Sequence, residues 1–494
     1  MYKELLKMVT NLGSPNVLVV GDFMLDVYVY GDALRISPEA PVPVLKVRQT
    51  EYSCGGAGSV VNDLAALGAK TFCLGVIGED KNGERLLEKL KAAGADVSGL
   101  KKASDRPTIS KQRLIGLAQH RHQQQLFRID EEVTDELPEK VCRGLMDSYS
   151  RQIKNVEIVC LQDYNKGLLG ESLCREMISL AKEAGKQVVV DPSMGGDYSK
   201  FRGATVMTPN RQEASAAVGF ELDTKEAIVR AGEQLCERFS LEAVVITLDK
   251  EGAYVKAGKL SEFIPTRPRS VYDVTGAGDV VLAMLATALA SGCEYKSAVQ
   301  LCNIAGGIEV EKFGVATVSV DEIVNEIISE RRGKDGKVRS IKSLVRELSW
   351  HRSQDEKIVF TNGCFDVIHR GHIEFLKFCR QQGDVVVLGL NSDSSVKSIK
   401  GTERPINNQH DRAWVLAAME AIDYITVFDE PEPLNLIKQV KPDILVKGED
   451  WSDKGVVGAE FVESYGGKVV LAPLVEGKST TSVIEKIKKV WKRI

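Results

Sequence analysis

A turn of small residues that ends on a carboxylate leads directly into an apolar segment. Gly276, Ala277, Gly278 and Asp279 precede the apolar run of residues 280–290, which predicts a buried helix. Free N–H groups at a helix start, together with the positive end of the helix dipole, bind anions such as phosphate. A carboxylate beside bound phosphate can take a proton from an attacking hydroxyl. We therefore expect Asp279 to act as a base in phosphoryl transfer; a tight turn with an N-terminal acid is the alternative.

Two histidines occur at a second predicted helix start. His369 and His372 end the segment TNGCFDVIHRGH, residues 361–372, and their spacing of three residues puts both imidazoles on one helical face. Donors in this position could bind nucleotide phosphates and stabilise the charge that develops on an α-phosphate. A zinc pair is one alternative, although no third ligand with suitable spacing follows. A purely structural pair is the other.

Two smaller signals accompany the first turn. Gly55 and Gly56 form a second glycine-rich turn at the start of a predicted helix. Asn210 and Glu213 lie three residues apart in TPNRQE, residues 208–213, just after a predicted strand. An amide and a carboxylate on one helical face suit a phosphate or a metal-bound water.

The composition excludes several classes of protein. The chain has 494 residues with 43% hydrophobic and 27% charged residues, which is typical of a globular protein of more than one domain. The net charge of −4 supplies no basic field, so we expect no nucleic-acid partner. The longest apolar stretch is too short to span a membrane, and the first residues lack a secretory signal. We expect a cytoplasmic protein without membrane contact, and free thiols because the cysteines form no CxxC pair.

The order of apolar segments predicts an α/β fold. Short β-branched runs alternate with helical segments and indicate a three-layer domain with a largely parallel sheet over residues 1–330. Within it, the more alternating segments 42–47, 108–115 and 126–129 predict a small β lid.

A second domain is predicted after a break in this pattern. Residues 331–339 read RRGKDGKVR, and together with a short amphipathic helix they predict a linker over residues 331–356. The strand rhythm then restarts and predicts a smaller, doubly wound, Rossmann-like domain over residues 357–494.

Taken in order, the motifs of the first domain resemble those of sugar kinases of the ribokinase family. The motifs are GDFMLD at 21–26, the diglycine at 55–56, DP at 191–192, TPNRQE at 208–213 and DVTGAGD at 273–279. RISPEAPVPV at 35–44 and DYNKG at 163–167 narrow the resemblance to the heptose 7-phosphate kinases.

This resemblance implies a ribokinase-like fold and a set of site residues. It implies that Asp279 is the catalytic base and that Glu213 binds Mg²⁺. It also implies contacts to ATP and contacts to the sugar. The ATP contacts are Asn210, Arg211, Gln212, Glu213, Gly276, Ala277 and Gly278, and the sugar contacts are Asp26, Gly55 and Gly56.

A phosphorylated sugar also needs cations. Lys111, Arg113 and Arg128 lie on the predicted lid strands and are expected to bind the sugar phosphate. A solvated strand face is the alternative for each of them.

The second domain resembles the nucleotidyltransferases that carry an HxGH signature, here HRGH at 369–372. NSD at 391–393, KGTERPI at 400–406, VKGEDW at 446–451 and STTSVI at 479–484 support the resemblance. A sugar 1-phosphate is already ionised, so its attack on an α-phosphate needs alignment and charge neutralisation more than a base. His369 and His372 are expected to be catalytic. The expected contacts to ATP are Lys397, Lys400, Arg404, Ser479 and Thr480.

In combination, the two parts resemble the bifunctional kinase and adenylyltransferase enzymes of ADP-heptose synthesis. Such an enzyme phosphorylates D-glycero-D-manno-heptose 7-phosphate at the anomeric hydroxyl and later couples heptose 1-phosphate to ATP. A separate phosphatase acts between the two steps, and we expect a homo-oligomer. Another sugar kinase fused to a cytidylyltransferase is the nearest alternative. A nucleotide-sensing module with degenerate sites is a more distant one.

Overall fold

The computed structural model describes residues 2–117, 124–267, 276–312, 316–452 and 455–473. The chain divides into two compact units, Met1–Ile327 and Ile328–Ile494. In the described ranges, no helix is long and apolar enough to cross a membrane. All ten cysteines are free.

The first unit is built on a nine-stranded sheet, counted over the described residues, in the order β13-β12-β11-β10-β9-β8-β1-β4-β5. Its strands are β1 (Asn16–Gly21), β4 (Lys70–Gly78), β5 (Asp96–Ala103), β8 (Ile158–Gln162), β9 (Gln187–Asp191), β10 (Val206–Met207), β11 (Ala243–Thr247), β12 (Ala253–Ala257) and β13 (Leu260–Ile264). The strands from β5 to β11 pair in parallel, and β12 and β13 are antiparallel. β8 is buried along its whole length, as expected of a parallel strand covered on both faces.

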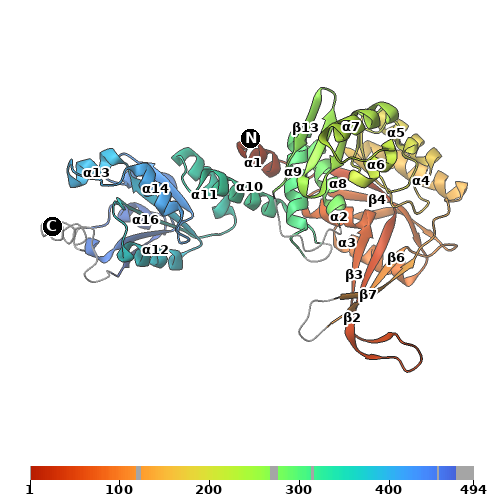
Figure 1. Cartoon of the computed structure of the whole chain (residues 1–494), viewed down its shortest axis with the longest axis horizontal. Coiled ribbons are helices and arrows are strands. Elements are labelled where there is room, and N and C mark those ends of the chain that lie inside the picture. Colours follow the sequence, from red (N-terminus) through yellow and green to blue (C-terminus); the bar gives the residue numbers. More distant parts are fainter. Residues whose placement is uncertain (1, 118–123, 268–275, 313–315, 453–454, 474–494) are drawn as a thin grey trace. The chain divides into compact units, whose positions relative to one another are not determined.

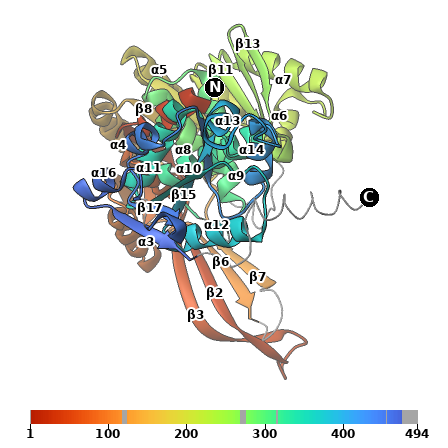
Figure 2. The ribbon, with the colours of Figure 1, turned by 90° about the vertical axis from the view of Figure 1, so that its left-hand side faces the viewer.

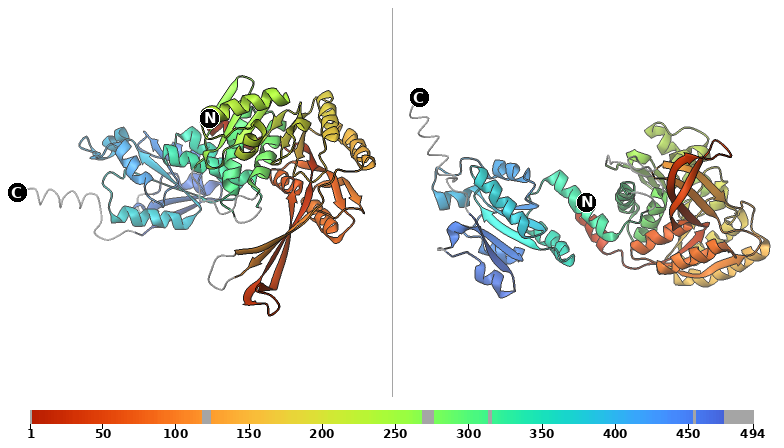
Figure 3. Two further views of the ribbon diagram at one scale, coloured as in Figure 1. Left: turned by 45° about the vertical axis from the view of Figure 1, so that its right-hand side comes forward. Right: turned by 90° about the horizontal axis from the view of Figure 1, so that it is seen from below.

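Helices cover this sheet on both faces (Figure 3). The helices of this unit are α1 (Tyr2–Thr10), α2 (Ala57–Ala66), α3 (Lys81–Ala92), α4 (Glu139–Gln152), α5 (Glu171–Glu183), α6 (Arg211–Val218), α7 (Lys225–Phe239), α8 (Ala277–Ala290) and α9 (Tyr295–Glu309), and α10 (Val320–Asp335) begins in it. The three-layer α/β architecture predicted from the sequence is confirmed. α8 is buried along nearly its whole length, which explains its continuous apolar sequence.

A separate sheet forms the predicted lid. Its order is β3-β2-β6-β7, with β2 (Phe23–Ile36), β3 (Pro43–Gly56), β6 (Ser110–Gly116) and β7 (Gln124–Glu131). Figures 1 and 2 show these strands extending away from the nine-stranded sheet. The strand β2 was itself not predicted, because its first residues are buried without alternation.

The second unit carries a five-stranded parallel sheet, counted over the described residues, in the order β16-β15-β14-β17-β18. The strands are β14 (Ile358–Gly363), β15 (Val385–Asn391), β16 (Tyr424–Phe428), β17 (Ile444–Gly448) and β18 (Lys468–Ala472). The helices are α11 (Ile341–Ser353), α12 (Arg370–Gln382), α13 (Asp393–Lys400), α14 (Gln409–Ala417), α15 (Leu434–Val440) and α16 (Ala459–Ser464). Helices α11, α15 and α16 cover one face, and α12 and α14 cover the other. This is the predicted doubly wound, Rossmann-like topology, and its strand order turns between β14 and β17.

The segment predicted as a linker contains part of this second unit. Residues 331–335 continue α10, and α11 packs Leu344 and Leu348 into the core beside β14 and β15. Arg339 forms a buried ion pair with Glu347 at 3.1 Å. Because Leu344 and Leu348 are four residues apart, they share the helical face that the core covers. Residues 341–353 are therefore part of the folded unit and do not serve as a spacer.

This packing predicts a local loss of stability. Leu348→Ala should lower the free energy of unfolding of the second unit by about 2–5 kcal/mol, because it leaves a cavity at a fully buried site. Urea unfolding of the full chain, monitored together with the rate of each activity, measures this effect. Lys342→Ala, at an exposed position of the same helix, is the matched control. Equal unfolding of the two variants would show that α11 does not belong to this core.

Candidate active sites

A cavity of about 260 Å³ opens in the first unit where β8 and β9 end. Its lining includes the strand ends Gln162 and Asp191, then Asn210 and Glu213, and Asp279 in the first turn of α8. Loops that follow parallel strands meet at one edge of the sheet, which is where α/β folds bind ligands. The cavity therefore has the position of an active site.

Asp279 lies at the bottom of this arrangement and is only 5% exposed. Its helix begins after Gly276, whose φ of 100° favours glycine and which has no side chain to accept the first N–H groups. Gly278 also lines the cavity, and Ala277 is the first residue of the helix. The helix start can therefore present its N–H groups to an anion, as the sequence predicted.

Two donors hold the Asp279 carboxylate. Gln162 Nε2 donates to Asp279 Oδ1 at 2.9 Å and to Asp191 Oδ2 at 3.0 Å. The Tyr164 hydroxyl donates to Asp279 Oδ1 at 3.1 Å. Burial, and then the charge of Asp191, raise the pKa of Asp279 well above its usual range, while the Tyr164 hydrogen bond lowers it. These donors thus favour the ionised form that a base requires.

Asn210 and Glu213 have a structural role as well as a place in the cavity. The Asn210 side chain accepts the N–H of Glu213 at 2.9 Å, and Glu213 Oε2 accepts the N–H of Asn210 at 2.8 Å, so the pair forms a capping box on α6. Arg211 instead donates a hydrogen bond to the carbonyl of Leu222 at 2.5 Å, and Gln212 is exposed. The ATP contacts predicted for Arg211 and Gln212 stay predictions.

The donor chemistry around Glu213 fits a magnesium ion that also binds substrate phosphates. Burial raises the pKa of Glu213 to about 7, and the charge of Asp191 adds to this effect. A bound cation would favour the ionised carboxylate. Among the described residues, no group of three or more His, Cys, Asp or Glu side chains could hold a metal on its own. Mg²⁺ keeps several waters and needs only one or two protein carboxylates when phosphates complete its shell.

The predicted sugar contacts meet at the base of the lid. Asp26 is buried and forms an ion pair with Arg113. A Cβ at Gly55 would lie 2.3 Å from Asp26 Oδ2, and Gly56 has a φ of 56°, so both positions require glycine. The Lys111 ammonium lies 5.1 Å from the centre of the Tyr164 ring. The structure thus brings Asp26, Gly55, Gly56, Arg113 and Lys111 together, and Tyr164 connects them to Asp279.

Arg128 lies opposite Arg113 in the register of β6 and β7, so both side chains share one face of the lid. Its guanidinium forms two hydrogen bonds with Asp130, at 2.9 and 2.8 Å, and the side chain is 51% exposed. A contact between Arg128 and the sugar phosphate therefore stays a prediction.

The second site lies at the start of α12. His369 is the N-cap residue, and the His369 and His372 rings stack with centroids 3.9 Å apart. His372 Nδ1 accepts the N–H of His369 at 3.4 Å, which leaves the proton of a neutral ring on Nε2. Burial, followed by the charges of His369 and Lys400, lowers the pKa of His372 to about 4. His372 is therefore a neutral donor at physiological pH.

The cations predicted near the triphosphate differ in their surroundings. Lys397 and Lys400 are exposed on the last turns of α13, and Lys400 acts electrostatically on His372. Arg404 is held by an ion pair with Asp366, whose side chain is fully buried. Phosphate contacts of all three stay predictions. Ser479 and Thr480 lie outside the described residues.

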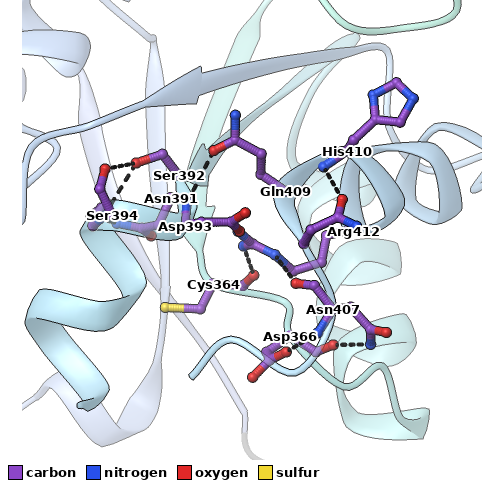
Figure 4. A network of polar contacts seen from close by, with 12 residues as sticks. Cys364, Asp366, Asn391, Ser392, Asp393, Ser394, Asn407, Gln409, His410 and Arg412 are labelled. Atoms are coloured by element: carbon purple, nitrogen blue, oxygen red, sulfur yellow. Dashed lines mark hydrogen bonds and ion pairs between the residues drawn. The ribbon is translucent and has the colours of Figure 1, made fainter. Parts of the chain in front are cut away.

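A buried arginine connects the loops around the second site, as Figure 4 shows. Arg412 donates to the carbonyl of Cys364 at 2.5 Å, to the carbonyl of Asn407 at 3.0 Å and to Asp393 Oδ1 at 2.7 Å. The turn after β14, the start of α13 and the loop before α14 are thereby joined. Asp366 also connects these loops, because it accepts hydrogen bonds from the N–H groups of Ile406 and Asn407 at 2.7 and 3.1 Å.

Comparison with known proteins supports two activities. The pfkB family of carbohydrate kinases matches residues 14–322, and the cytidylyltransferase-like family matches residues 360–483. The bifunctional protein HldE of Geobacter sulfurreducens is 44% identical over 491 residues and covers 99% of each chain. That of Mesorhizobium japonicum is 42% identical over 483 residues, covering 97% of this chain and 96% of the relative. The chain belongs to the bifunctional HldE family.

Membership of the HldE family confirms the enzyme predicted from the sequence, a kinase and an adenylyltransferase of heptose biosynthesis. The alternative of another sugar kinase fused to a cytidylyltransferase is not favoured, because the relatives match both domains together. Both activities use ATP as substrate. The roles of individual residues stay predictions.

Solved structures agree with the fold of the first domain. Phosphofructokinase-2 from Escherichia coli superposes with a TM-score of 0.53 at 20% identity, covering 64% of this chain and 99% of that chain. A ribokinase from Arabidopsis thaliana, solved with ribose and ATP, gives 0.50 at 20% identity with the same coverage. At this identity the likeness concerns the fold alone, and it confirms the predicted ribokinase-like class.

Among the cavity residues that sequence reasoning missed, Gln162 and Tyr164 contact Asp279 directly. Gln162 is the last residue of β8, and Tyr164 belongs to the DYNKG motif that was used only for the family resemblance. Both signals were present, because polar residues directly after a buried parallel strand lie at the ligand edge of the sheet. Their shared target, Asp279, is more than a hundred residues away and could not be read from spacing.

Tyr164→Phe should impair the kinase in a pH-dependent manner. The hydroxyl stabilises the Asp279 carboxylate, so its removal raises the pKa of Asp279, and the acid limb of the kcat/KM profile should move to higher pH. A hydrogen bond to a charged group contributes about 1.5 kcal/mol or more, so the rate at neutral pH should fall by about tenfold. Tyr254→Phe, whose hydroxyl pairs with Ser261, is the control. An unchanged pH profile would exclude this role of Tyr164.

Proposed function

We propose that the cavity at the start of α8 transfers the γ-phosphoryl group of ATP to the anomeric hydroxyl of D-glycero-D-manno-heptose 7-phosphate. The observation that carries this proposal is the buried Asp279 carboxylate, held by two donors beside the N–H groups of its own helix. A base and an anion site within one helical turn match the needs of this reaction.

In the kinase step, Asp279 takes the proton of the attacking hydroxyl while Gln162 and Tyr164 hold its carboxylate in place. The N–H groups that follow Gly276 stabilise the charge on the transferred phosphoryl group. Mg²⁺ bound with ATP neutralises phosphate charge, and Glu213 is the residue that would hold it. Asp26 orients the sugar, and Lys111 and Arg113 bind its 7-phosphate from the lid.

We propose that the second domain transfers the adenylyl group of ATP to heptose 1-phosphate. An oxygen of the sugar phosphate attacks the α-phosphorus, and the bond to the β-phosphate breaks with release of pyrophosphate. His372 donates a hydrogen bond from its Nε2–H to a phosphate oxygen, because its lowered pKa keeps the ring neutral. His369 binds phosphate beside it, and Lys400 supplies positive charge.

A separate phosphatase must act between these steps, because the kinase product carries a second phosphate that heptose 1-phosphate lacks. The intermediate therefore has to leave the first site before it can enter the second. We also propose that the enzyme works in the cytoplasm, because both of its steps consume ATP.

We further propose a homo-oligomer formed through the outer face of the lid, which is the face opposite to that of Arg113 and Arg128. Phe127 and Ile129 on β7 are 64% and 46% exposed, which is unusual for large apolar side chains on one strand face. A second copy of the same sheet would cover them. Phe127→Lys should lower the molar mass measured by light scattering, whereas the control Gln124→Lys should not. A wild-type chain that is monomeric at micromolar concentration would exclude the oligomer.

The two-site scheme predicts that each activity can be abolished alone. Asp279→Asn removes the base and should lower the kinase rate by at least about a hundredfold while the adenylyltransferase rate stays near that of the wild type. His372→Ala should have the reverse effect. Coupled ADP and pyrophosphate assays with heptose 7-phosphate and heptose 1-phosphate measure both rates. If either variant lost both activities while still folded, the sites would not be independent.

A further inference from the structure

Lys447 is a buried cation of the second domain that the proposed mechanism does not use. It lies near the end of β17 and is 6% exposed. Its Nζ donates to Asn362 Oδ1 at 2.5 Å and, at 3.4 Å, to the carbonyl of the same residue. It also lies 5.2 Å from the ring centre of Trp451.

Lys447 differs from other buried cations in the partner of its charged group. Lys200, Arg339 and Arg412 are similarly buried, and each pairs with a carboxylate, at 2.7, 3.1 and 2.7 Å respectively. Within the residues that the structure describes, no carboxylate forms an ion pair with Lys447, whose hydrogen-bond partner is a neutral amide. Asp450 acts on the ammonium electrostatically but does not form an ion pair with it. A buried charge without a paired counter-charge is costly unless a ligand supplies one.

The position of Lys447 indicates where that ligand comes from. β14 and β17 are neighbours at the point where the strand order turns, and the crevice beyond the carboxyl ends of such strands is the ligand site of doubly wound folds. Asn362 lies near the end of β14, and the same segment continues to His369 at the start of α12. Lys447 therefore faces the crevice from β17, opposite the strand that leads to the histidines.

The ammonium also keeps a donor for a ligand. It has three N–H groups, and Asn362 offers only its side-chain oxygen and its carbonyl. At least one N–H can therefore point to an anion. Burial lowers the pKa of Lys447 to about 8, so most molecules carry the charge at neutral pH, and a bound anion would favour it further.

We propose that Lys447 is a further substrate-contacting residue of the adenylyltransferase site. Its ammonium binds a phosphate group in the crevice beyond the carboxyl ends of β14 and β17. This inference depends on the proposed transferase function. The phosphate belongs either to ATP or to heptose 1-phosphate. Both reactants are anions, so a cation between them reduces the repulsion that opposes attack. The ammonium keeps its proton throughout, while the new bond to the α-phosphorus forms and pyrophosphate leaves.

Lys447→Met tests the proposal in the full-length chain, because methionine keeps an unbranched apolar stem and removes the charge. We expect kcat/KM of pyrophosphate release from ATP and heptose 1-phosphate to fall by about a hundredfold, as for the loss of one charge-stabilising donor. The kinase rate should not change. A rise in the KM for ATP would assign the phosphate to ATP, and a rise in the KM for heptose 1-phosphate would assign it to the sugar. A fall in kcat alone would assign the contact to the transition state.

A purely structural role of Lys447, joining β14 to β17 through Asn362, makes a different prediction. Lys447→Met would then lower the stability of the second domain in urea without changing kcat or either KM, and this result would overturn the proposal. Lys468→Met, at an exposed position on the adjacent strand β18, is the matched control and should change neither property.

Two further comparisons keep the test decisive. If Lys447→Met does not fold, Lys447→Arg and Lys447→Gln replace it. A higher transferase activity of Lys447→Arg than of Lys447→Gln supports a charge contact. Equal activity of the two variants overturns the proposal. The wild-type chain separates this inference from the proposed function. Absence of pyrophosphate release from the wild type would contradict the transferase function, whereas an active wild type with an equally active Lys447→Met would contradict the role of Lys447 alone.

Discussion

Both sites depend on the cost of removing charged groups from water at the carboxyl edge of a parallel sheet. In each domain the strands end at one edge, so the polar residues that follow them are buried close together. The first domain gathers Asp191, Glu213 and Asp279 there, and burial raises the pKa of each carboxyl. The charge of Asp191 adds to this effect at Glu213 and Asp279. Such a cluster favours ligands that bring positive charge or donate hydrogen bonds, which suits a nucleotide bound with a cation.

In the kinase domain, two hydrogen-bond donors offset this cost at the Asp279 carboxylate. Gln162 joins Asp191 to Asp279 through a single amide nitrogen, and Tyr164 adds a hydroxyl on the same oxygen of Asp279. These donors fix the orientation of the carboxylate without supplying a full positive charge. Tyr164 also lies under the Lys111 ammonium of the lid, so Asp279 and the lid strands meet at one aromatic ring.

The transferase domain has the opposite charge problem. Its reactants are anions, and its site combines the neutral His372 imidazole with cations from several elements. The buried Arg412 and the half-buried Arg404 are neutralised by carboxylates and hold loops in place, as Figure 4 shows for Arg412. Lys447 is buried beside a neutral amide, which leaves its charge for a ligand. A cationic side chain can thus serve architecture or binding, and its partner decides which.

The two α/β domains, the lid and the two helix starts could be predicted from the amino-acid sequence, because each leaves a local pattern. Continuous apolar runs mark buried parallel strands, and the Gly276–Asp279 and His369–His372 turns carry their chemistry within a few residues. The folded chain alone shows which distant side chains meet: Gln162 and Tyr164 on Asp279, Asp26 on Arg113, and Asn362 on Lys447. It also places α11 in the second core. These contacts depend on strand order and packing, and no spacing along the chain encodes them.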